Sequence, residues 1–350
     1  MSSGNGLAQE IEICSEQLGF PWNDSDPFVC PPVCMRGQDG MDFAKPVSYA
    51  ETPPGGSDLS IFTPEEQRFA QWDCRFMSQI PGMGPELPTD ESTPWSWQWM
   101  PSGVLYKAYL ASNREARLGI HLVHEDARPH NFWDPILGGK IPLLRFGNQS
   151  KVYPEGFQLD VEGAALARLT LDHEREMYSA DYRFALPLTY RKNHWEWKIG
   201  YYHISSHMGD EQMLRFYHNT GILWRRNYVR DCILFGVGYR PDANWRFYFG
   251  GDYAFYTQDG AMPWQLELGA EYAPIILPGY HGAPFAAVHL KWSEENDWTT
   301  YVAFEVGWQW RTVYQHIFRT GLYLMHGPAD QYQFYDLVEK QIGWGMWFDF

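Results

Sequence analysis

Long hydrophobic runs are absent from this sequence of 350 residues. No stretch approaches the ~20 consecutive apolar residues of a membrane-spanning helix, which excludes a helical membrane protein. Positive charge is also scarce, with 27 Lys and Arg against 43 Asp and Glu and a formal net charge of −16. Because no basic stripe offsets phosphate charge, nucleic acid is excluded as a partner.

Cysteine is scarce too, with 5 residues in the chain. The early ones are Cys14, Cys30, Cys34 and Cys74. We expect them to form two disulfides in an exported segment, since their spacing matches no common metal-ligand pattern. Cys232 would then be an unpaired thiol. The opening MSSGNGLAQEIEIC lacks the basic and apolar regions of a secretory signal, so we expect a removed signal or an assigned start too far downstream.

Residues 1–100 are rich in Pro, Gly, Ser and Asp, as in NDSDPFVCPPVC and ETPPGGSD. This composition predicts an irregular, cysteine-containing extension. One short helix is predicted inside it, in TPEEQRFAQWDCRFMSQIP, where Thr63 is the N-cap, Pro64 the first helical residue and Glu66 the capping-box partner. Residues 101–350 form the second predicted domain.

Aromatic residues are abundant, at 17% of the chain, although the mean hydropathy is only −0.44. From about residue 103 they recur at alternate positions in segments separated by turns. In residues 177–190 one side carries Tyr182, Phe184, Leu186 and Leu188, and the other carries Ser179, Asp181 and Arg183. Long strands with one apolar and one polar face are typical of tilted strands that cross a bilayer.

We predict strands at 104–111, 115–123, 156–171, 177–190, 194–207, 226–239, 244–257, 263–273, 283–293, 298–310, 317–326 and 341–350. Residues 124–155 have room for another strand and stay unassigned. The predicted fold is therefore all-β, a transmembrane antiparallel β-barrel of about twelve strands. The soluble alternative is a sandwich or lipocalin-like barrel with an aromatic interior.

The last strand carries the sharpest fold signal. QIGWGMWFDF ends in Phe350, and every second position before it is large and apolar: Phe348, Met346, Trp344 and Ile342. This pattern resembles the terminal strand of bacterial outer-membrane barrels. The resemblance implies an outer-membrane location and recognition of Phe350 by the barrel-assembly machinery. Counting strands back from a periplasmic end places the long connection 208–225 outside the cell, as expected for extracellular loops.

The segment HWEWKIGYYHISSHMGDE, residues 194–211, places His203 and Ser205 on its apolar face. Side chains at i and i+2 of a strand point the same way, with Cα atoms about 6.6–6.8 Å apart, so an imidazole can reach a serine hydroxyl. This pairing is the first requirement of a serine nucleophile activated by a general base. The next strand offers Asp231 or Asn227 as the acceptor that orients the imidazole, and the register decides between them.

The HIS element in YYHISSH resembles the His-x-Ser element of outer-membrane phospholipase A and of lipid A 3-O-deacylase. The resemblance implies a serine hydrolase of outer-leaflet phospholipid or lipid A, with His203 as base, Ser205 as nucleophile and Asp231 or Asn227 as orienting group. Those families typically place Asn after the Ser, whereas Ser206 follows here. Over residues 140–350, including EGFQLDVEGAALARL, the chain also resembles an uncharacterised bacterial family of predicted outer-membrane β-barrels, which implies the fold and no activity.

Several alternatives stay open. Asp210 and Glu211 are candidate Ca²⁺ ligands, or simply solvated loop residues. His203 and Ser205 could be interfacial polar residues, since the cost of such groups falls to ~0–1 kcal/mol near the membrane surface. Without catalysis, the barrel would be a channel or uptake barrel or a structural surface protein. Lumen charges that would set channel selectivity are Glu196, Lys198, Arg183 and Asp252. Membrane lipid and a second copy of the chain are the expected partners.

Overall fold

The computed structural model describes residues 34–36, 42–44, 86–89, 93–126, 130–172, 174–275, 282–312 and 314–350. The chain divides into two compact units, Met1–Pro85 and Glu86–Phe350. In the first unit, β1 (Cys34–Arg36) pairs antiparallel with β2 (Asp42–Ala44). The predicted helix at 63–81 and the side chains of the four early cysteines lie outside the described residues, so the disulfides stay a prediction.

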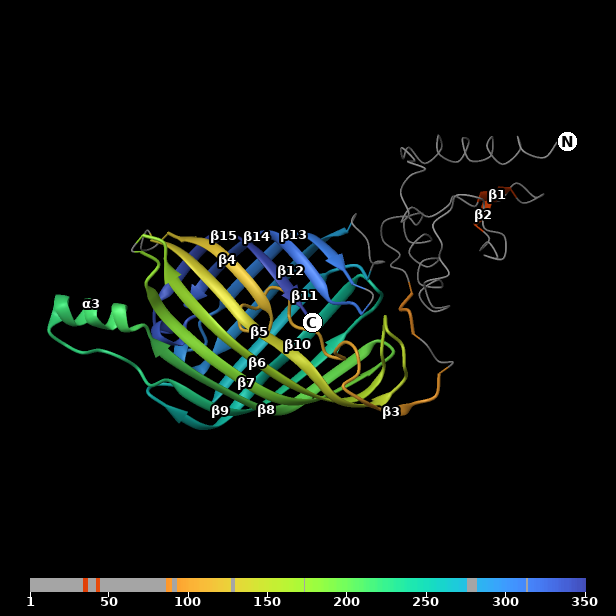
Figure 1. Ribbon diagram of the computed structural model, residues 1–350, viewed down its shortest axis with the longest axis horizontal. Coiled ribbons are helices and arrows are strands. Elements are labelled where there is room, and N and C mark those ends of the chain that lie inside the picture. The colour runs from red at the N-terminus through yellow and green to blue at the C-terminus, as the bar shows by residue number, and fades with distance from the viewer. Residues whose placement is uncertain are drawn as a thin grey trace. The chain divides into compact units, whose positions relative to one another are not determined.

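Twelve strands of the second unit close into an antiparallel barrel, which confirms the predicted fold (Figure 1). They are β4 (Leu118–Glu125), β5 (His130–Gly147), β6 (Gly156–Thr170), β7 (Met177–Lys192), β8 (Trp195–Met208), β9 (Val229–Tyr239), β10 (Trp245–Gln258), β11 (Trp264–Tyr272), β12 (Ala283–Ser293), β13 (Tyr301–Arg311), β14 (Ile317–Pro328) and β15 (Val338–Asp349). Each strand pairs with the next, and β15 closes the ring on β4.

The wall is irregular beside β5, because β4 is much shorter than its neighbour. β4 pairs with residues 130–137 of β5, and the additional strand β3 (Ser96–Trp99) pairs with residues 144–147. Residues 138–143 of β5 therefore have β6 on one side and no strand on the other. The Phe350 ring covers part of this gap, 3.1 Å from the position that a Cβ on Gly139 would occupy.

The predicted number of strands is right, but one strand was assigned to the wrong residues. Residues 104–111 form no strand and lie inside the barrel. The missing strand is β5, within the unassigned stretch 124–155. Pro135, Pro142 and the pair Gly138–Gly139 interrupt its alternation, and both residue types are unusual inside a strand, so the pattern did not reveal it.

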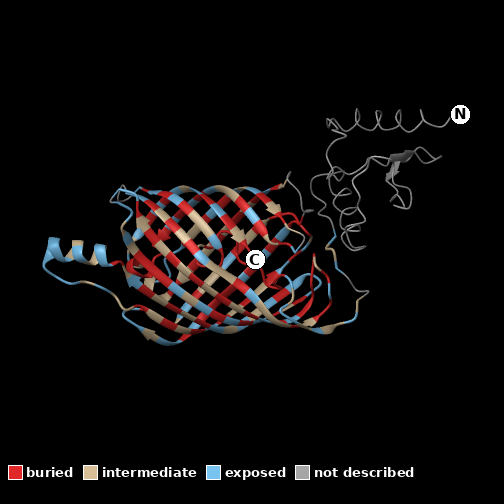
Figure 2. Cartoon of the chain, in the orientation of Figure 1, coloured by how far each residue is buried: buried red, intermediate tan, exposed pale blue. Residues whose placement is uncertain are grey.

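Buried and exposed residues alternate along the wall strands (Figure 2). The large exposed residues include many apolar ones, and the buried ones include many charged ones. On β8, Trp197 is 50% exposed and Ile199 56%, whereas Glu196 is 1% exposed. Arginines on the inward face, such as Arg168 and Arg319, are completely buried. This arrangement is the one predicted for a barrel that faces lipid, and it contradicts the soluble alternative, which places the apolar faces inside.

Residues 102–117, which lie between β3 and β4 in the sequence, occupy the interior of the barrel. We call this stretch the lumen segment. Arg319 of β14 donates to the main-chain oxygen of Leu110 at 2.7 Å, and Lys140 of β5 pairs with Glu115 at 2.8 Å. Other wall residues that bind this segment are Asp181 on β7, Arg246 on β10, Glu271 on β11 and Asp349 on β15. The segment is thus held from many strands at once.

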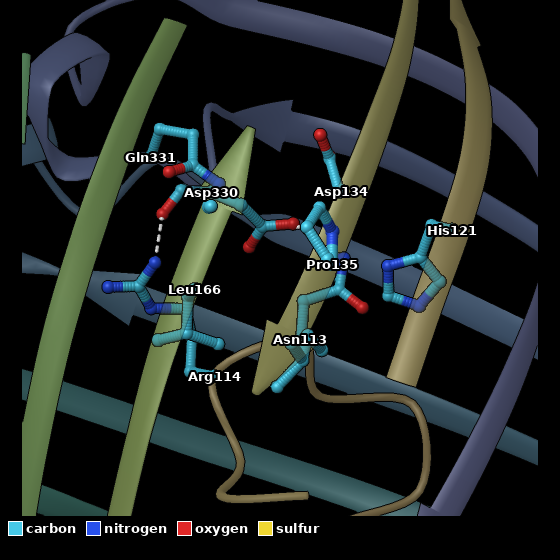
Figure 3. A pocket seen from close by; sticks show the side chains of 10 residues that line it. Asn113, Arg114, His121, Asp134, Pro135, Leu166, Asp330 and Gln331 are labelled. Carbon is cyan, nitrogen blue, oxygen red and sulfur yellow. Dashed lines mark hydrogen bonds between the residues drawn. The ribbon is translucent and has the colours of Figure 1, made fainter. Parts of the chain in front are cut away.

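A small cavity adjoins the lumen segment (Figure 3). A cavity of about 10 Å³, roughly the space of one water molecule, is bounded by this segment, by β4–β6 and by the loop after β14. That loop contains the 3₁₀ turn η3 (Tyr332–Phe334), and the main-chain oxygen of its Asp330 accepts a 2.7 Å hydrogen bond from the Arg114 guanidinium.

One α-helix is found among the described residues, α3 (Asp210–Thr220), which follows β8 at the barrel rim. It ends at Gly221, whose φ of 73° is left-handed, and none of its residues is buried. A second 3₁₀ turn, η2 (Glu294–Asn296), follows β12. Across the described ranges, no helix combines the length and the hydropathy needed to cross a membrane.

Candidate functional site

His203 and Ser205 lie near the end of β8, on its outward face. β8 runs between β7 and β9, and His203 stands opposite Phe184 on one side and Asp231 on the other. Ser205 stands opposite Tyr182. Phe184 and Tyr182 are both exposed, so the two polar residues sit in a largely aromatic and apolar surface.

His203 is hydrogen-bonded to Asp231 on the neighbouring strand. Its Nδ1 lies 2.8 Å from Oδ1 of the carboxylate, and the two side chains are 34% and 23% exposed. An ionised carboxylate can only accept, so we assign the imidazole proton to Nδ1. Nε2 is then the free basic nitrogen, which is the state that a general base requires.

Ser205 shares the outward face with His203, two residues further along β8. Within the described part of the chain its hydroxyl has no hydrogen-bond partner. The spacing of about 6.6–6.8 Å between i and i+2 Cα atoms leaves the hydroxyl within reach of an imidazole that leans along the strand. His203 and Ser205 form no hydrogen bond in the described part of the chain, so proton transfer between them requires this contact to close when substrate binds.

Asn227, the alternative orienting residue, has other partners. The β8–β9 ladder ends at the pair Ser205 and Val229, so Asn227 lies beyond it. Its side-chain amide donates to Gln258 at 2.9 Å, and its main-chain N–H donates to Asp259 at 2.6 Å. The register therefore brings Asp231, and not Asn227, to the imidazole. The catalytic roles themselves stay predictions.

Tyr201 is a third partner in the site that the sequence did not single out. Its hydroxyl donates to Oδ1 of Asp231 at 2.5 Å, the same oxygen that His203 contacts. Tyr201 precedes His203 by two residues, so its parity on β8 was known. Tyr201 shares the outward face of β8 with His203, and only the register with β9 shows that it reaches a carboxylate.

A β-bulge on β10 lies beside this group. The register between β9 and β10 shifts between Ala254 and Tyr256, and Tyr256 stands opposite Asp231. The extra residue, Phe255, is 58% exposed, and its ring centroid lies 6.5 Å from that of Tyr201. Bulges re-aim side chains and are common next to functional sites. Here the bulge adds an aromatic ring to the site.

Asp210 and Glu211, the candidate calcium ligands, form the first turn of α3 and are exposed. Calcium takes six to eight oxygen ligands. Among the described residues, no three His, Cys, Asp or Glu side chains are grouped to hold a metal ion. The protein side chains found here do not fit a complete calcium site, and the two carboxylates have a simpler explanation as favourable charges at a helix N-terminus.

The inward face of the same strands is occupied by paired charges. Cys232, next to Asp231 in sequence, is a buried free thiol, as predicted. The four lumen residues named for a channel are in ion pairs: Glu196 with Arg246, Lys198 with Glu267, Arg183 with Glu162 and Asp252 with Arg230. These charges therefore hold one another and the lumen segment in place.

Solved structures similar to this chain are outer-membrane barrels. Outer membrane phospholipase A from Escherichia coli is 13% identical, with a TM-score of 0.44, over 67% of this chain and 92% of that one. The calcium-bound phospholipase dimer from Salmonella typhi is 14% identical, with a TM-score of 0.42, over 67% and 90%. The outer membrane protein OprD from Pseudomonas aeruginosa is 9% identical, with a TM-score of 0.27, over 72% and 97%.

These similarities concern the barrel alone. No curated protein matches the chain. A family model, in contrast, covers most of the sequence. Residues 54–350 match the model described as "Protein of unknown function (DUF1207)", and the chain belongs to that family.

Proposed function

We propose that this barrel lies in the bacterial outer membrane and hydrolyses acyl esters of an outer-leaflet lipid, with Ser205 as nucleophile. His203 acts as the general base and Asp231 orients it. The observation that carries the proposal is the hydrogen bond between His203 and Asp231 on the outward face, with the Ser205 hydroxyl on the same face. Such a group is rare on a surface that otherwise presents apolar side chains.

The membrane placement is supported by the distribution of exposed aromatic residues. Near one end of the barrel they include Trp97, Trp99, Trp195 and Trp245, and near the other Tyr182, Tyr256, Trp264 and Trp298. Exposed aliphatic residues between them include Ile199, Leu268 and Leu322. Two aromatic belts around an apolar band are typical of barrels that span a bilayer.

The first half of the reaction acylates Ser205. Nε2 of His203 takes the hydroxyl proton while the serine oxygen attacks the carbonyl carbon of the ester, and the carbonyl oxygen becomes an oxyanion. The ester C–O bond then breaks. His203 returns the proton to the departing alcohol, which is the deacylated lipid, and the fatty acyl group stays on Ser205.

The second half releases the fatty acid. A water molecule takes the position of the alcohol, His203 removes its proton, and the resulting hydroxide attacks the acyl-serine carbonyl. The bond to Ser205 breaks and the serine recovers its proton from His203. Asp231 keeps Nδ1 protonated throughout, so Nε2 alone exchanges protons with the reactants.

The site is reached from the membrane and not from the lumen. His203 and Ser205 are flanked by Phe184 and Tyr182, which face outward, whereas the inward neighbours Ile204 and Ser206 are completely buried. An acyl chain could therefore approach Ser205 laterally within the outer leaflet. This geometry favours a lipid ester over a water-soluble substrate.

The direct test is acyl release by the purified, folded barrel. Wild type and Ser205→Ala are incubated with radiolabelled phospholipid and, separately, with lipid A, and free fatty acid is measured. We expect release from one of the two lipids by wild type and a loss of at least about 1000-fold in the variant. Equal rates for the two proteins would remove the proposal, and the lipid that reacts identifies the substrate class.

Two further elements belong to this proposal. Asp210 and Glu211 stay the candidate calcium ligands, with the remaining ligands supplied by lipid head groups and water. A second copy of the chain, packed on the outward face, is the candidate partner. Assays with and without EDTA, and cross-linking in detergent, test these two elements separately. Recognition of Phe350 by the assembly machinery is tested by comparing insertion of wild type and Phe350→Ala.

A further inference from the structure

We infer that Tyr201 is a positioning residue of this site, holding the Asp231 carboxylate that orients His203. The hydrogen bond between Tyr201 and Asp231 is present whether or not the protein is an enzyme. The expected effect on kcat rests on the proposed function. The role belongs to the tyrosine hydroxyl and not to the aromatic ring.

Two donors meet at one carboxylate oxygen. The Tyr201 hydroxyl lies 2.5 Å and Nδ1 of His203 lies 2.8 Å from Oδ1 of Asp231. His203 stands directly opposite Asp231 in the β8–β9 ladder, and Tyr201 stands opposite Ile233, one diagonal step away. Aromatic side chains reach diagonal neighbours across an antiparallel pair, so the strand register itself sets up this contact.

The second donor matters because Asp231 faces a largely apolar surface. A charged group with too few partners in such surroundings is destabilised, and a carboxylate held by one donor is free to rotate away from the imidazole. The Tyr201 hydroxyl gives the same carboxylate oxygen a second donor. The imidazole is therefore held in one orientation, with Nε2 directed away from Asp231.

The ring of Tyr201 is in turn supported by the bulge on β10. Phe255, the extra residue, lies with its ring centroid 6.5 Å from that of Tyr201. A tyrosine that served only as an interfacial aromatic would need the ring and not the hydroxyl. Tyr201→Phe separates the two roles, since it keeps the ring and removes the hydrogen bond.

The first readout is structural. In ¹⁵N-histidine-labelled protein in detergent micelles, the His203 signals are assigned by their absence in His203→Gln. Wild type should show a single Nδ1–H tautomer with a downfield, slowly exchanging proton. In Tyr201→Phe we expect faster exchange of this proton and a mixture of tautomers. Tyr239→Phe, which alters an outward tyrosine at the far end of β9, should match wild type.

The second readout is kinetic. Tyr201→Phe should lower kcat about 10- to 100-fold with little change in KM, as for other residues that orient a catalytic ligand through a hydrogen bond. Tyr239→Phe should leave both constants unchanged. Phe255→Ala removes a ring that lies near the ring of Tyr201. Its His203 proton exchange and its kcat should lie between the values of wild type and Tyr201→Phe.

The outcomes of the two readouts are distinct. A His203 spectrum that is identical in wild type and Tyr201→Phe overturns the inference, whatever the activity. Equal losses of activity in Tyr201→Phe and Tyr239→Phe also overturn it, because they indicate a general effect of outward tyrosines. If wild type releases no fatty acid, the proposed function fails, and the spectra alone then decide whether Tyr201 positions Asp231.

Discussion

Arg319 on the wall strand β14 donates a 2.7 Å hydrogen bond to the main-chain oxygen of Leu110, in the middle of the lumen segment. Arg246 on β10 does the same for the oxygen of Lys107, at 3.0 Å. Each guanidinium is also paired with wall carboxylates, so the wall and its contents form one network. The lumen segment is thus bound to several strands of the wall.

The filled lumen predicts that the wild-type barrel conducts no steady ion current. Purified protein in planar bilayers should give no open-pore conductance at moderate voltage, because the lumen segment occupies the interior and is bound to several wall strands. A stable current would show that the segment leaves the lumen, and would revive the channel hypothesis.

Loss of one anchoring arginine should loosen the lumen segment. Arg246→Ala leaves Glu196 and Glu271 buried with less compensation, and removal of one partner from such a pair costs about 3–5 kcal/mol. We expect a lower urea midpoint and brief current openings. Lys340→Ala is the matched control, since its pair with Asp126 is exposed and such pairs contribute about 0–1 kcal/mol. Similar losses in both variants would contradict the prediction.

Asp231 and Asn227 should differ sharply in their effect on acyl release. Asp231→Ala removes the partner of His203, and loss of an orienting carboxylate lowers kcat by about 10²- to 10⁴-fold. Asn227→Ala removes only a contact with Gln258, and its rate should stay within about twofold of wild type. The heat-modifiable gel shift of the folded barrel checks both variants. A larger loss in the asparagine variant would mean that the β8–β9 register differs in solution.

The membrane placement can be tested by the depth dependence of an arginine substitution. Ile199, which is 56% exposed, lies in the apolar band, and Ile199→Arg should lower the stability of the folded barrel by about 2–4 kcal/mol. Trp99, which is 80% exposed, lies near the rim, and Trp99→Arg should lower it by about 0–1 kcal/mol. The free energy of folding into lipid vesicles, measured in urea, gives both values. Equal, near-zero costs would indicate that water and not lipid covers this face.

The turn before β14 should make the barrel sensitive to mild acid. Burial, with a smaller contribution from Lys107, lowers the pKa of His316 to about 4. In the unfolded chain the value is about 6.5, so the folded state binds fewer protons between these two values. The stability that neutral His316 contributes is present above about pH 6.5 and is lost as the pH falls toward 4. The urea midpoint should drop between pH 7.5 and 5, and less so in His316→Gln.

The alternation of the wall strands could be predicted from the sequence because it is local. Trp197, Ile199 and Tyr201 share a face whatever their neighbours are. The strand β5 could not be predicted from the sequence, because Pro135 and Pro142 break the alternation that identifies a strand. The lumen segment was missed for a different reason: Leu110 donates to Glu271, 161 residues away, and no local pattern predicts such a contact.

In the candidate site, too, the features set by local spacing could be predicted, and those set by strand register could not. His203 and Ser205 follow from spacing along a single strand, and so they could be found from the sequence. The choice of Asp231 over Asn227 depends on how β9 aligns with β8 across the long connection that contains α3. The contact of Tyr201 depends on the same alignment, which is why the hydroxyl was not recognised as part of the site.

The incomplete pairing of β5 has a consequence for how the barrel assembles. The ring closes between β4 and β15, where residues 118–125 meet residues 341–348, so the closing ladder joins the parts of the wall that are farthest apart in the chain. Loop-closure entropy makes such a ladder slow to form. The stretch 138–143, which no strand covers on that side, adjoins this junction. We therefore expect the β4–β15 ladder, beside this uncovered stretch of β5, to form late in folding.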